Sequence, residues 1–204
     1  MASRKTLERL LDRRNEHPEE LPHIDAQVRA QFEATHAIFV LDMCGFSRLT
    51  MKHGIIHYLA LIRRMQNVVL PAIAEAGGEL LKTEADNVFG IFADVPAALA
   101  AAQAIQAELA LRNRGLPEDW DVHVSIGIGY GPLLMVGDHD AFGHEMNLAS
   151  KLGEDLAEAG DVFLTEAAYL RAGRKRAALT ARSARVSGLR LRYYSGRKRA
   201  PSKR

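Results

Sequence analysis

The sequence predicts an α+β fold in which four strands and two helices follow one another in the order βαββαβ. Three observations predict it: an unbroken apolar run at residues 37–41, two apolar-rich runs on either side of a polar turn at residues 84–87, and strict alternation at residues 122–128. An unbroken apolar run is typical of a strand buried on both faces, and alternation is typical of a half-buried strand. This order of elements is that of a ferredoxin-like core.

The first strand ends on Asp42, and Gly45 follows three residues later. Glycine permits a tight turn, and Phe46 or Ser47 can begin a helix. A carboxylate is therefore expected at the end of a strand, beside free backbone N–H groups of a turn and a helix start. Such a corner can hold a metal cation through the carboxylate and a phosphate through the amides.

The other elements follow from periodicity and from glycine and proline breaks. They are a helix at residues 49–76, a hairpin of strands at 79–83 and 88–92, a helix at 95–112, a strand at 121–130, a helix at 144–158, a strand at 161–165, a short helix, and a basic hairpin that ends near Tyr194.

The 204 residues suit one domain with extensions. We divide the chain into an N-terminal helical lead-in at residues 1–35, a main domain at 36–195 and a basic, disordered tail at 196–204. The lead-in is predicted to contain helices near 2–14 and 24–35.

The apolar content of 48% is that of an ordinary globular protein. No apolar run approaches the ~20 residues of a membrane span, and the first residues lack the apolar core of a secretion signal. Cys44 is the single cysteine, which excludes an internal disulfide. These features make a cytoplasmic location the default expectation.

The net charge of +2 hides an asymmetry, because residues 171–204 hold 13 Lys and Arg and no Asp or Glu. The simplest interpretation is a solvated final hairpin with a frayed end. A contact of this basic tail with an anionic surface stays open, and we do not expect nucleic acid as a partner.

Two sets of polar residues can carry chemistry. Asp42 and Asp86 converge if the first strand lies beside the hairpin in a ferredoxin-like sheet, and two carboxylates beside a turn suit Mg²⁺ or Mn²⁺. Asn147 and Lys151 lie four residues apart on one predicted helix, after Asp140, so that both can face one ligand. The alternatives are ordinary turn chemistry at Asp86 and an ordinary amphipathic helix.

Taken together, these stretches resemble the catalytic domain of the class III nucleotidyl cyclases, the adenylate and guanylate cyclases, over residues 37–194. The segments that carry the resemblance are Asp42-Met-Cys-Gly-Phe-Ser, similar to the family's first metal site; Lys82-Thr-Glu-Ala-Asp86, similar to its Lys-x-x-Gly-Asp hairpin; and Asp140-Ala-Phe-Gly143 with Met146-Asn147-Leu-Ala-Ser-Lys151, similar to its Asp-x-x-Gly-x-x-Val-Asn-x-Ala-Ser-Arg segment.

The resemblance implies an adenylate cyclase that forms 3′,5′-cyclic AMP and pyrophosphate from ATP. It implies two Mg²⁺ or Mn²⁺ ions per site, about 3.5–4 Å apart, held by Asp42 and Asp86 with Met43. It also implies that backbone amides of Met43, Cys44, Gly45 and Phe46 hold phosphate, and that Asn147 and Lys151 are catalytic.

In the family, Lys82 and Asp140 would read the base. Lysine donates to N1 of adenine and aspartate accepts from its N6 amine, whereas guanine presents the reverse pattern. A pyrimidine is less clearly excluded.

The family's geometry further implies a head-to-tail homodimer with shared sites. Each site would combine Asp42 and Asp86 of one chain with Lys82, Asp140, Asn147 and Lys151 of its partner. The regulator is unknown.

Two positions depart from the family's pattern. Ala85 stands where the family has Gly, although Ala resists positive φ. Lys151 stands where it has Arg, and lysine supplies a point charge without the planar fork of a guanidinium. Lys151 therefore keeps a second hypothesis open, a cyclase-like module that binds nucleotide or a partner without catalysis.

Overall fold

The computed structural model describes residues 3–137, 140–186 and 188–196. The predicted disorder of the tail therefore concerns residues that, apart from Gly196, lie outside the described part of the chain. The division of the chain into three parts stays a prediction.

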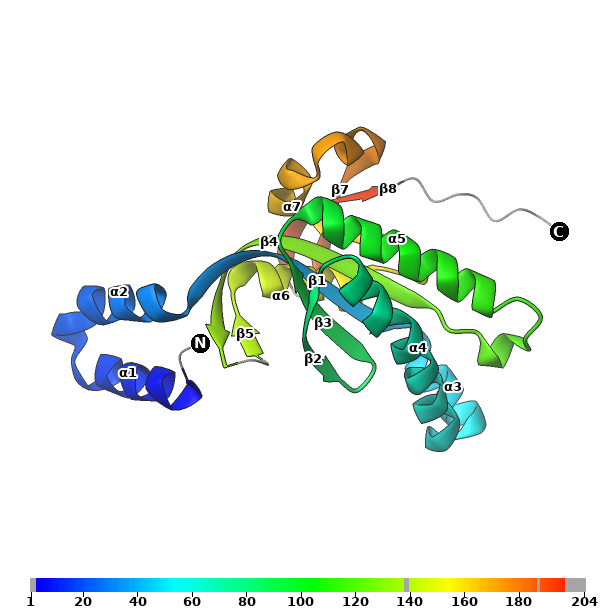
Figure 1. Ribbon diagram of the computed structural model, residues 1–204, viewed down its shortest axis with the longest axis horizontal. Coiled ribbons are helices and arrows are strands. Elements are labelled where there is room, and N and C mark those ends of the chain that lie inside the picture. Colours follow the sequence, from blue (N-terminus) through cyan, green and yellow to red (C-terminus); the bar gives the residue numbers. More distant parts are fainter. Residues whose placement is uncertain (1–2, 138–139, 187, 197–204) are drawn as a thin grey trace.

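The described part of the chain forms a series of helices and strands (Figure 1). In order they are α1 (Arg4–Glu16), η1 (Pro18–Glu20), α2 (Leu21–Phe32), β1 (Glu33–Met43), α3 (Phe46–His53), α4 (Ile55–Glu75), β2 (Glu79–Glu84), β3 (Asn87–Phe92), α5 (Val95–Arg112), η2 (Glu118–Trp120), β4 (Val124–Val136), β5 (Asp140–Phe142), α6 (His144–Ser150), η3 (Lys151–Leu156), β6 (Val162–Thr165), α7 (Glu166–Arg171), η4 (Gly173–Ala178), β7 (Leu179–Val186) and β8 (Leu189–Gly196).

The strands form one sheet in the order β2-β3-β1-β4-β6-β8-β7, and β5 pairs with the far end of β4. The first strand is central, as predicted, because β1 pairs with β3 on one side and with β4 on the other, both antiparallel. The predicted ferredoxin-like order is thus confirmed. The extension adds β6 parallel to β4 and then the β7–β8 hairpin.

Helices α4 and α5 cover one face of this sheet and contact each other along it (Figure 1). Their apolar sides pack on the inward side chains of β1 and β4, such as Phe39 and Ile126, which are fully buried. On the other face, α6 packs against Ile38 and Val40 of β1. The central strand is therefore buried on both faces, which explains its unbroken apolar run.

Helix α6 approaches the sheet closely because β4 contains glycine at the contact. A Cβ added at Gly127 would lie 2.0 Å from the backbone oxygen of Ala149. A Cβ added at Gly153, in the following turn, would lie 3.1 Å from the carbonyl oxygen of Val40. These contacts fix the height of α6 and of η3 over β1, and with it the position of Asn147 and Lys151.

Two helix predictions were wrong in detail. The single helix expected at residues 49–76 is two helices, because Gly54 has φ +80° and interrupts the chain between α3 and α4. The helix expected at 144–158 keeps α-helical hydrogen bonding only to Ser150 and continues as a π-helix, η3, to Leu156. Neither break has a proline, so the helical periodicity passed through both.

The N-terminal helices lie at the far end of the β1–β4 ribbon, on the side of β5 (Figure 1). Helix α2 runs directly into β1, which begins at Glu33 rather than at residue 37. A small separate core joins α1 and α2 to the extended end of β4; its buried members are Leu7, Leu10, Ile24, Val28, Phe32 and Val136. Within the described residues, no helix combines the length and apolar content that crossing a membrane requires.

Candidate active site

Asp42 and Asp86 meet at the end of the central strand. Asp42 is the second-last residue of β1, and Asp86 lies in the turn between β2 and β3. Both line one open cavity of about 480 Å³, whose other lining residues are Met43, Cys44, Gly45, Phe46, Ser47 and Arg48. The predicted convergence of the two carboxylates is therefore what the structure shows.

Tyr58 of α4 connects the two sides of this corner. Its hydroxyl donates to Oδ2 of Asp86 at 2.6 Å and lies 3.4 Å from the carbonyl oxygen of Met43. The ring is 1% exposed and packs edge-on against Phe46 at 4.8 Å. This role could not be predicted from the sequence, because Tyr58 fits the apolar period of its helix and only its hydroxyl indicates another function.

The corner is electrostatically unfavourable for its own carboxylates. Burial, together with the negative charges of Asp86 and Glu154, raises the pKa of Asp42 to about 7. A bound divalent cation would supply the missing countercharge. The residues therefore fit such an ion: two carboxylates line one cavity with Met43, and their donor atoms are the oxygens that Mg²⁺ and Mn²⁺ prefer.

Glu154 is a third acidic residue near this corner that the sequence analysis missed. It belongs to η3, and partial burial of its carboxylate raises its pKa, with contributions from Asp155, Glu84 and Asp86. The π-helix and the close approach at Gly153 bring it toward β1. Helical spacing from Asn147 could not show this, since a π-turn rotates side chains away from the α-helical register.

The turn expected to hold phosphate is formed as predicted, with one amide already occupied. Gly45 has φ +100° and precedes α3, so that the first N–H groups of that helix follow the turn. The N–H of Cys44, however, donates to the carbonyl oxygen of His123 at 2.9 Å. Burial also raises the pKa of its thiol, which contacts Ser125 at 3.6 Å. In this structure, Gly45 and Phe46 are the better candidates for phosphate.

Lys82 and Asp140 contact each other, as a pair that reads one base requires. Nζ of Lys82 lies 3.3 Å from Oδ1 of Asp140 and 2.7 Å from Glu84. The hydrogen bond with Glu84 raises the pKa of Lys82, and Asp140 adds to this against the effect of burial. Strands β2 and β5, which carry the two residues, contact each other, and β5 pairs with β4.

Arg4 of the N-terminal helix also binds Asp140, a contact that the sequence analysis did not anticipate. Nη2 of Arg4 lies 2.7 Å from Oδ2 of Asp140. Burial acts to raise the pKa of Asp140, but the hydrogen bonds from Arg4 and Lys82 outweigh it and hold the pKa below its ordinary value. Nothing in the lead-in sequence pointed to this contact, since it joins residues 136 positions apart.

Asn147 and Lys151 lie on the face of the sheet that α6 covers, outside the cavity of Asp42 and Asp86. Asn147 is exposed, and Lys151 is half-buried with its Nζ 3.9 Å from Asp155. The structure of one chain therefore brings the two metal-site carboxylates together and the two base-reading residues together. It does not bring Asn147 and Lys151 into either group.

Ala85 adopts the positive φ that glycine would adopt more easily at this position. This residue has φ +50°, and it is the one non-glycine residue with positive φ among the described residues. It immediately precedes Asp86 in the β2–β3 turn. The left-handed conformation costs a residue with a Cβ roughly 1–2 kcal/mol, which the turn tolerates.

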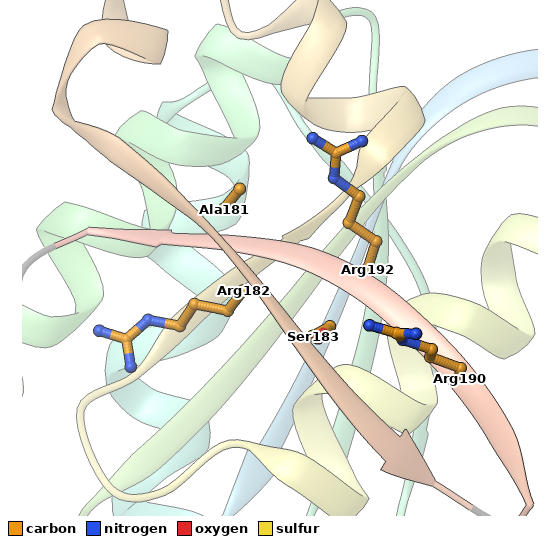
Figure 2. A pocket seen from close by; sticks show the side chains of 5 residues that line it. All are labelled: Ala181, Arg182, Ser183, Arg190 and Arg192. Carbon is orange, nitrogen blue, oxygen red and sulfur yellow. The ribbon is translucent and has the colours of Figure 1, made fainter.

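The basic final hairpin forms as β7 and β8, and part of its charge gathers in one hollow. Figure 2 shows Arg182, Arg190 and Arg192 around it, with their guanidinium groups directed to different sides. Arg192 is paired with Glu166 at 3.1 Å. The contact of this region with an anionic surface stays a prediction, and residues 197–204 lie outside the described chain.

Solved structures with the same fold identify the family of this domain. The chain superposes on the "Adenylate/Guanylate Cyclase/Hydrolase" from Silicibacter pomeroyi with a TM-score of 0.70 and 27% identity, over 80% of this chain and 96% of that one. The domain is a class III nucleotidyl cyclase catalytic domain. The adenylyl cyclase CyaB from P. aeruginosa shares the fold of this cyclase domain with a TM-score of 0.66 and 20% identity, over 83% and 96% of the chains.

Curated sequences support the same assignment. The cyclase domain is 32% identical over 130 residues to the Rhizobium meliloti (strain 1021) protein named "Putative adenylate cyclase 3". The aligned residues make up 64% of this chain and 22% of that protein. It is 26% identical over 144 residues to the serine/threonine-protein kinase pkn2 of Myxococcus xanthus, over 71% and 17% of the chains. The chain thus spans about a fifth of the length of these relatives, and no protein-family model matches it.

Proposed function

We propose that this domain is an adenylate cyclase that converts ATP to 3′,5′-cyclic AMP and pyrophosphate. The observation that supports it best is that the chain contains two pairs of side chains, one suited to metal-bound phosphates and one suited to adenine. Asp42 and Asp86 share a cavity at the end of β1, and Lys82 and Asp140 form a donor and acceptor pair beside β4. The first suits metal-bound phosphates and the second suits the N1 and N6 edge of adenine.

Asp42, Asp86 and the carbonyl of Met43 would hold the Mg²⁺ or Mn²⁺ ions. When bound, such ions lower the pKa of an attacking hydroxyl and neutralise phosphate charge. The protein's own contribution is position: Tyr58 holds Asp86 and the Met43 carbonyl in place, and the Gly45 turn presents N–H groups to the triphosphate.

We infer a head-to-tail homodimer from the separation of the groups within one chain. Asn147 and Lys151 are outside the cavity of Asp42 and Asp86, and Asn147 is exposed on α6. A second chain can bring these residues to the carboxylates by a twofold contact, which would produce two equivalent sites. In this proposal Lys151 stabilises charge on the phosphates and Asn147 orients the nucleotide.

Lys151 favours one other candidate, a cyclase-like module that binds nucleotide with little or no turnover. Lysine replaces the forked guanidinium of the family's arginine, and here its ammonium is 3.9 Å from Asp155. A cyclase that acts on a pyrimidine nucleotide is the variant that keeps the chemistry and changes the base.

One experiment separates these functions. Purified protein is incubated with Mn²⁺ and with ATP, GTP, CTP or UTP in parallel, and the products are analysed for cyclic nucleotide. We expect cyclic AMP as the main product, and none from protein with Asp42→Asn. A main product from GTP or from a pyrimidine would overturn the base assignment. No product from any of the four would favour the binding module.

A further inference from the structure

The N-terminal helix α1 reaches the proposed base-reading pair. Arg4, the first residue of α1, donates from Nη2 to Oδ2 of Asp140 at 2.7 Å. Figure 1 shows one end of this helix near β5, the short strand that begins with Asp140. An element far outside the core thus occupies the carboxylate oxygen that would accept a hydrogen bond from an adenine amine.

Asp140 does not need Arg4 to hold its position. Its Oδ1 accepts from the backbone N–H of Ala141 at 3.0 Å and from Lys82 at 3.3 Å. Its backbone is fixed by the β4–β5 pairing, opposite Val136. The hydrogen bond from Arg4 therefore occupies Oδ2 of a side chain that other contacts already orient.

Arg4 is itself easy to displace. Its side chain is 58% exposed, whereas that of Asp140 is 19% exposed. Between Arg4 and the middle of α1, Leu7 is the one buried side chain, so the first turn of the helix has little packing to hold it. An ion pair with one largely exposed partner contributes little stability and weakens with salt.

We propose that α1 is a strap over the base-reading pair of Lys82 and Asp140, in which Arg4 competes with the exocyclic amine of the nucleotide for Asp140. This inference rests on the proposed function, because it takes Asp140 as the acceptor for the base. In the free protein the strap is closed and Lys82 and Asp140 satisfy each other. Nucleotide binding breaks the Arg4 bond and frees Oδ2, so that anything that lifts α1 increases the apparent affinity for ATP.

The size of the effect follows from the nature of the contact. Exposed ion pairs are commonly worth a factor of about two to five in an equilibrium constant. Because Arg4 is already displaced in the complex with ATP, its loss changes binding and leaves the chemical step unaffected. We therefore expect Arg4→Gln to lower the KM for ATP by about two- to fivefold, with kcat unchanged.

The test compares wild type, Arg4→Gln and the matched control Lys5→Gln, which removes the neighbouring charge of α1 and is not among the partners of Asp140 in the described chain. KM and kcat for ATP are measured with Mn²⁺ at low and at high KCl. The ratio of KM values, wild type to Arg4→Gln, is expected to fall toward one as salt screens the ion pair, and Lys5→Gln is expected to follow wild type.

A role in positioning Asp140 would give the opposite result, a higher KM or a lower kcat for Arg4→Gln, and would overturn the proposal. An equal effect of Lys5→Gln would also overturn it, because the cause would then be general charge. If no variant forms a cyclic product, the proposed function fails separately, and the strap is tested by displacement of a fluorescent ATP analogue. Tighter ATP binding by Arg4→Gln would support it; equal or absent binding would refute it.

Discussion

The two halves of the proposed site differ in how their charges are arranged. At the end of β1, Asp42 and Asp86 line one cavity, and burial and like charge raise the pKa of Asp42 to about 7. Beside β5, Asp140 lies between two cations, Arg4 and Lys82, which hold its pKa below the ordinary value. One half lacks countercharge, and the other half is already neutralised.

This difference indicates what each half needs from a ligand. The carboxylate corner gains stability when a cation arrives, so that metal and triphosphate binding relieve a cost of folding. The base-reading pair of Lys82 and Asp140 has to exchange contacts within the protein for contacts with the nucleotide. We therefore expect substitutions at the corner to change activity strongly, and substitutions around the base-reading pair to change affinity moderately.

The largest effect is expected from removing the charge at the corner. Asp42→Asn or Asp86→Asn keeps the size of the side chain and weakens metal binding, so that cyclic AMP formation should fall by about 100-fold or more. The measurement is the initial rate with saturating Mn²⁺ and ATP, with Asp12→Asn on the exposed side of α1 as the matched control. A rate within threefold of wild type would remove both carboxylates from the proposed mechanism.

The next largest effect is expected from a substitution at Lys151, the proposed phosphate-binding cation. Lys151→Arg introduces a planar fork that can hold two phosphate oxygens, and we expect kcat to rise roughly 10–1000-fold, which corresponds to about 1.4–4 kcal/mol. Lys175→Arg, in η4, is the control for a general effect of arginine. An unchanged or lower kcat would count against a phosphate-binding role for Lys151.

The unfavourable charge at the corner also predicts a dependence of stability on pH. The pKa of Asp42 rises from the ordinary 3.8 to about 7 on folding, so the metal-free protein loses stability as the pH increases from about 4 to about 7. Asn cannot titrate. Since the group is partly exposed, we expect Asp42→Asn to be more stable than wild type by about 1–2 kcal/mol at pH 8 and equal to it near pH 4.

Urea unfolding in EDTA at the two pH values measures this difference. A lower stability of Asp42→Asn at pH 8 would show that the carboxylate has a favourable partner in the metal-free protein. That result would end the contrast between the two halves of the site.

The smallest effect concerns the turn that holds Asp86. Ala85 has φ +50°, and glycine adopts this region without the Cβ penalty, although it adds entropy to the unfolded chain. We expect Ala85→Gly to stabilise the protein by about 0–1 kcal/mol in chemical denaturation, with activity maintained. Destabilisation by 1 kcal/mol or more would contradict the strain at this position.

Much of the fold could be predicted, because its determinants are local. The apolar run of β1, the turn before β3 and the alternation of β4 placed the strands, and the order confirmed β1 as the central one. The break at Gly54 and the π-turn after Ser150 were missed, since apolar periodicity continues across both. The first break is at a glycine with positive φ, and the second is where the chain closely approaches the sheet.

The candidate site divides in the same way. Asp42 and Asp86 could be predicted to converge because strand order alone brings them together. Tyr58, Glu154 and Arg4 could not, because each reaches the site through tertiary packing of an element that looks ordinary in sequence. The relation of Asn147 and Lys151 to the carboxylates involves a second chain and stays a prediction.

Complementation between two inactive variants tests the shared site most directly. Protein with Asp42→Asn and protein with Asn147→Ala are each assayed alone, then mixed at equal amounts after the exchange of subunits is verified. Random pairing puts half of the chains into mixed dimers with one intact site each, so the account predicts recovery of about a quarter of wild-type activity. No recovery in verified mixed dimers would show that Asp42 and Asn147 act within one chain, and would contradict the proposed geometry.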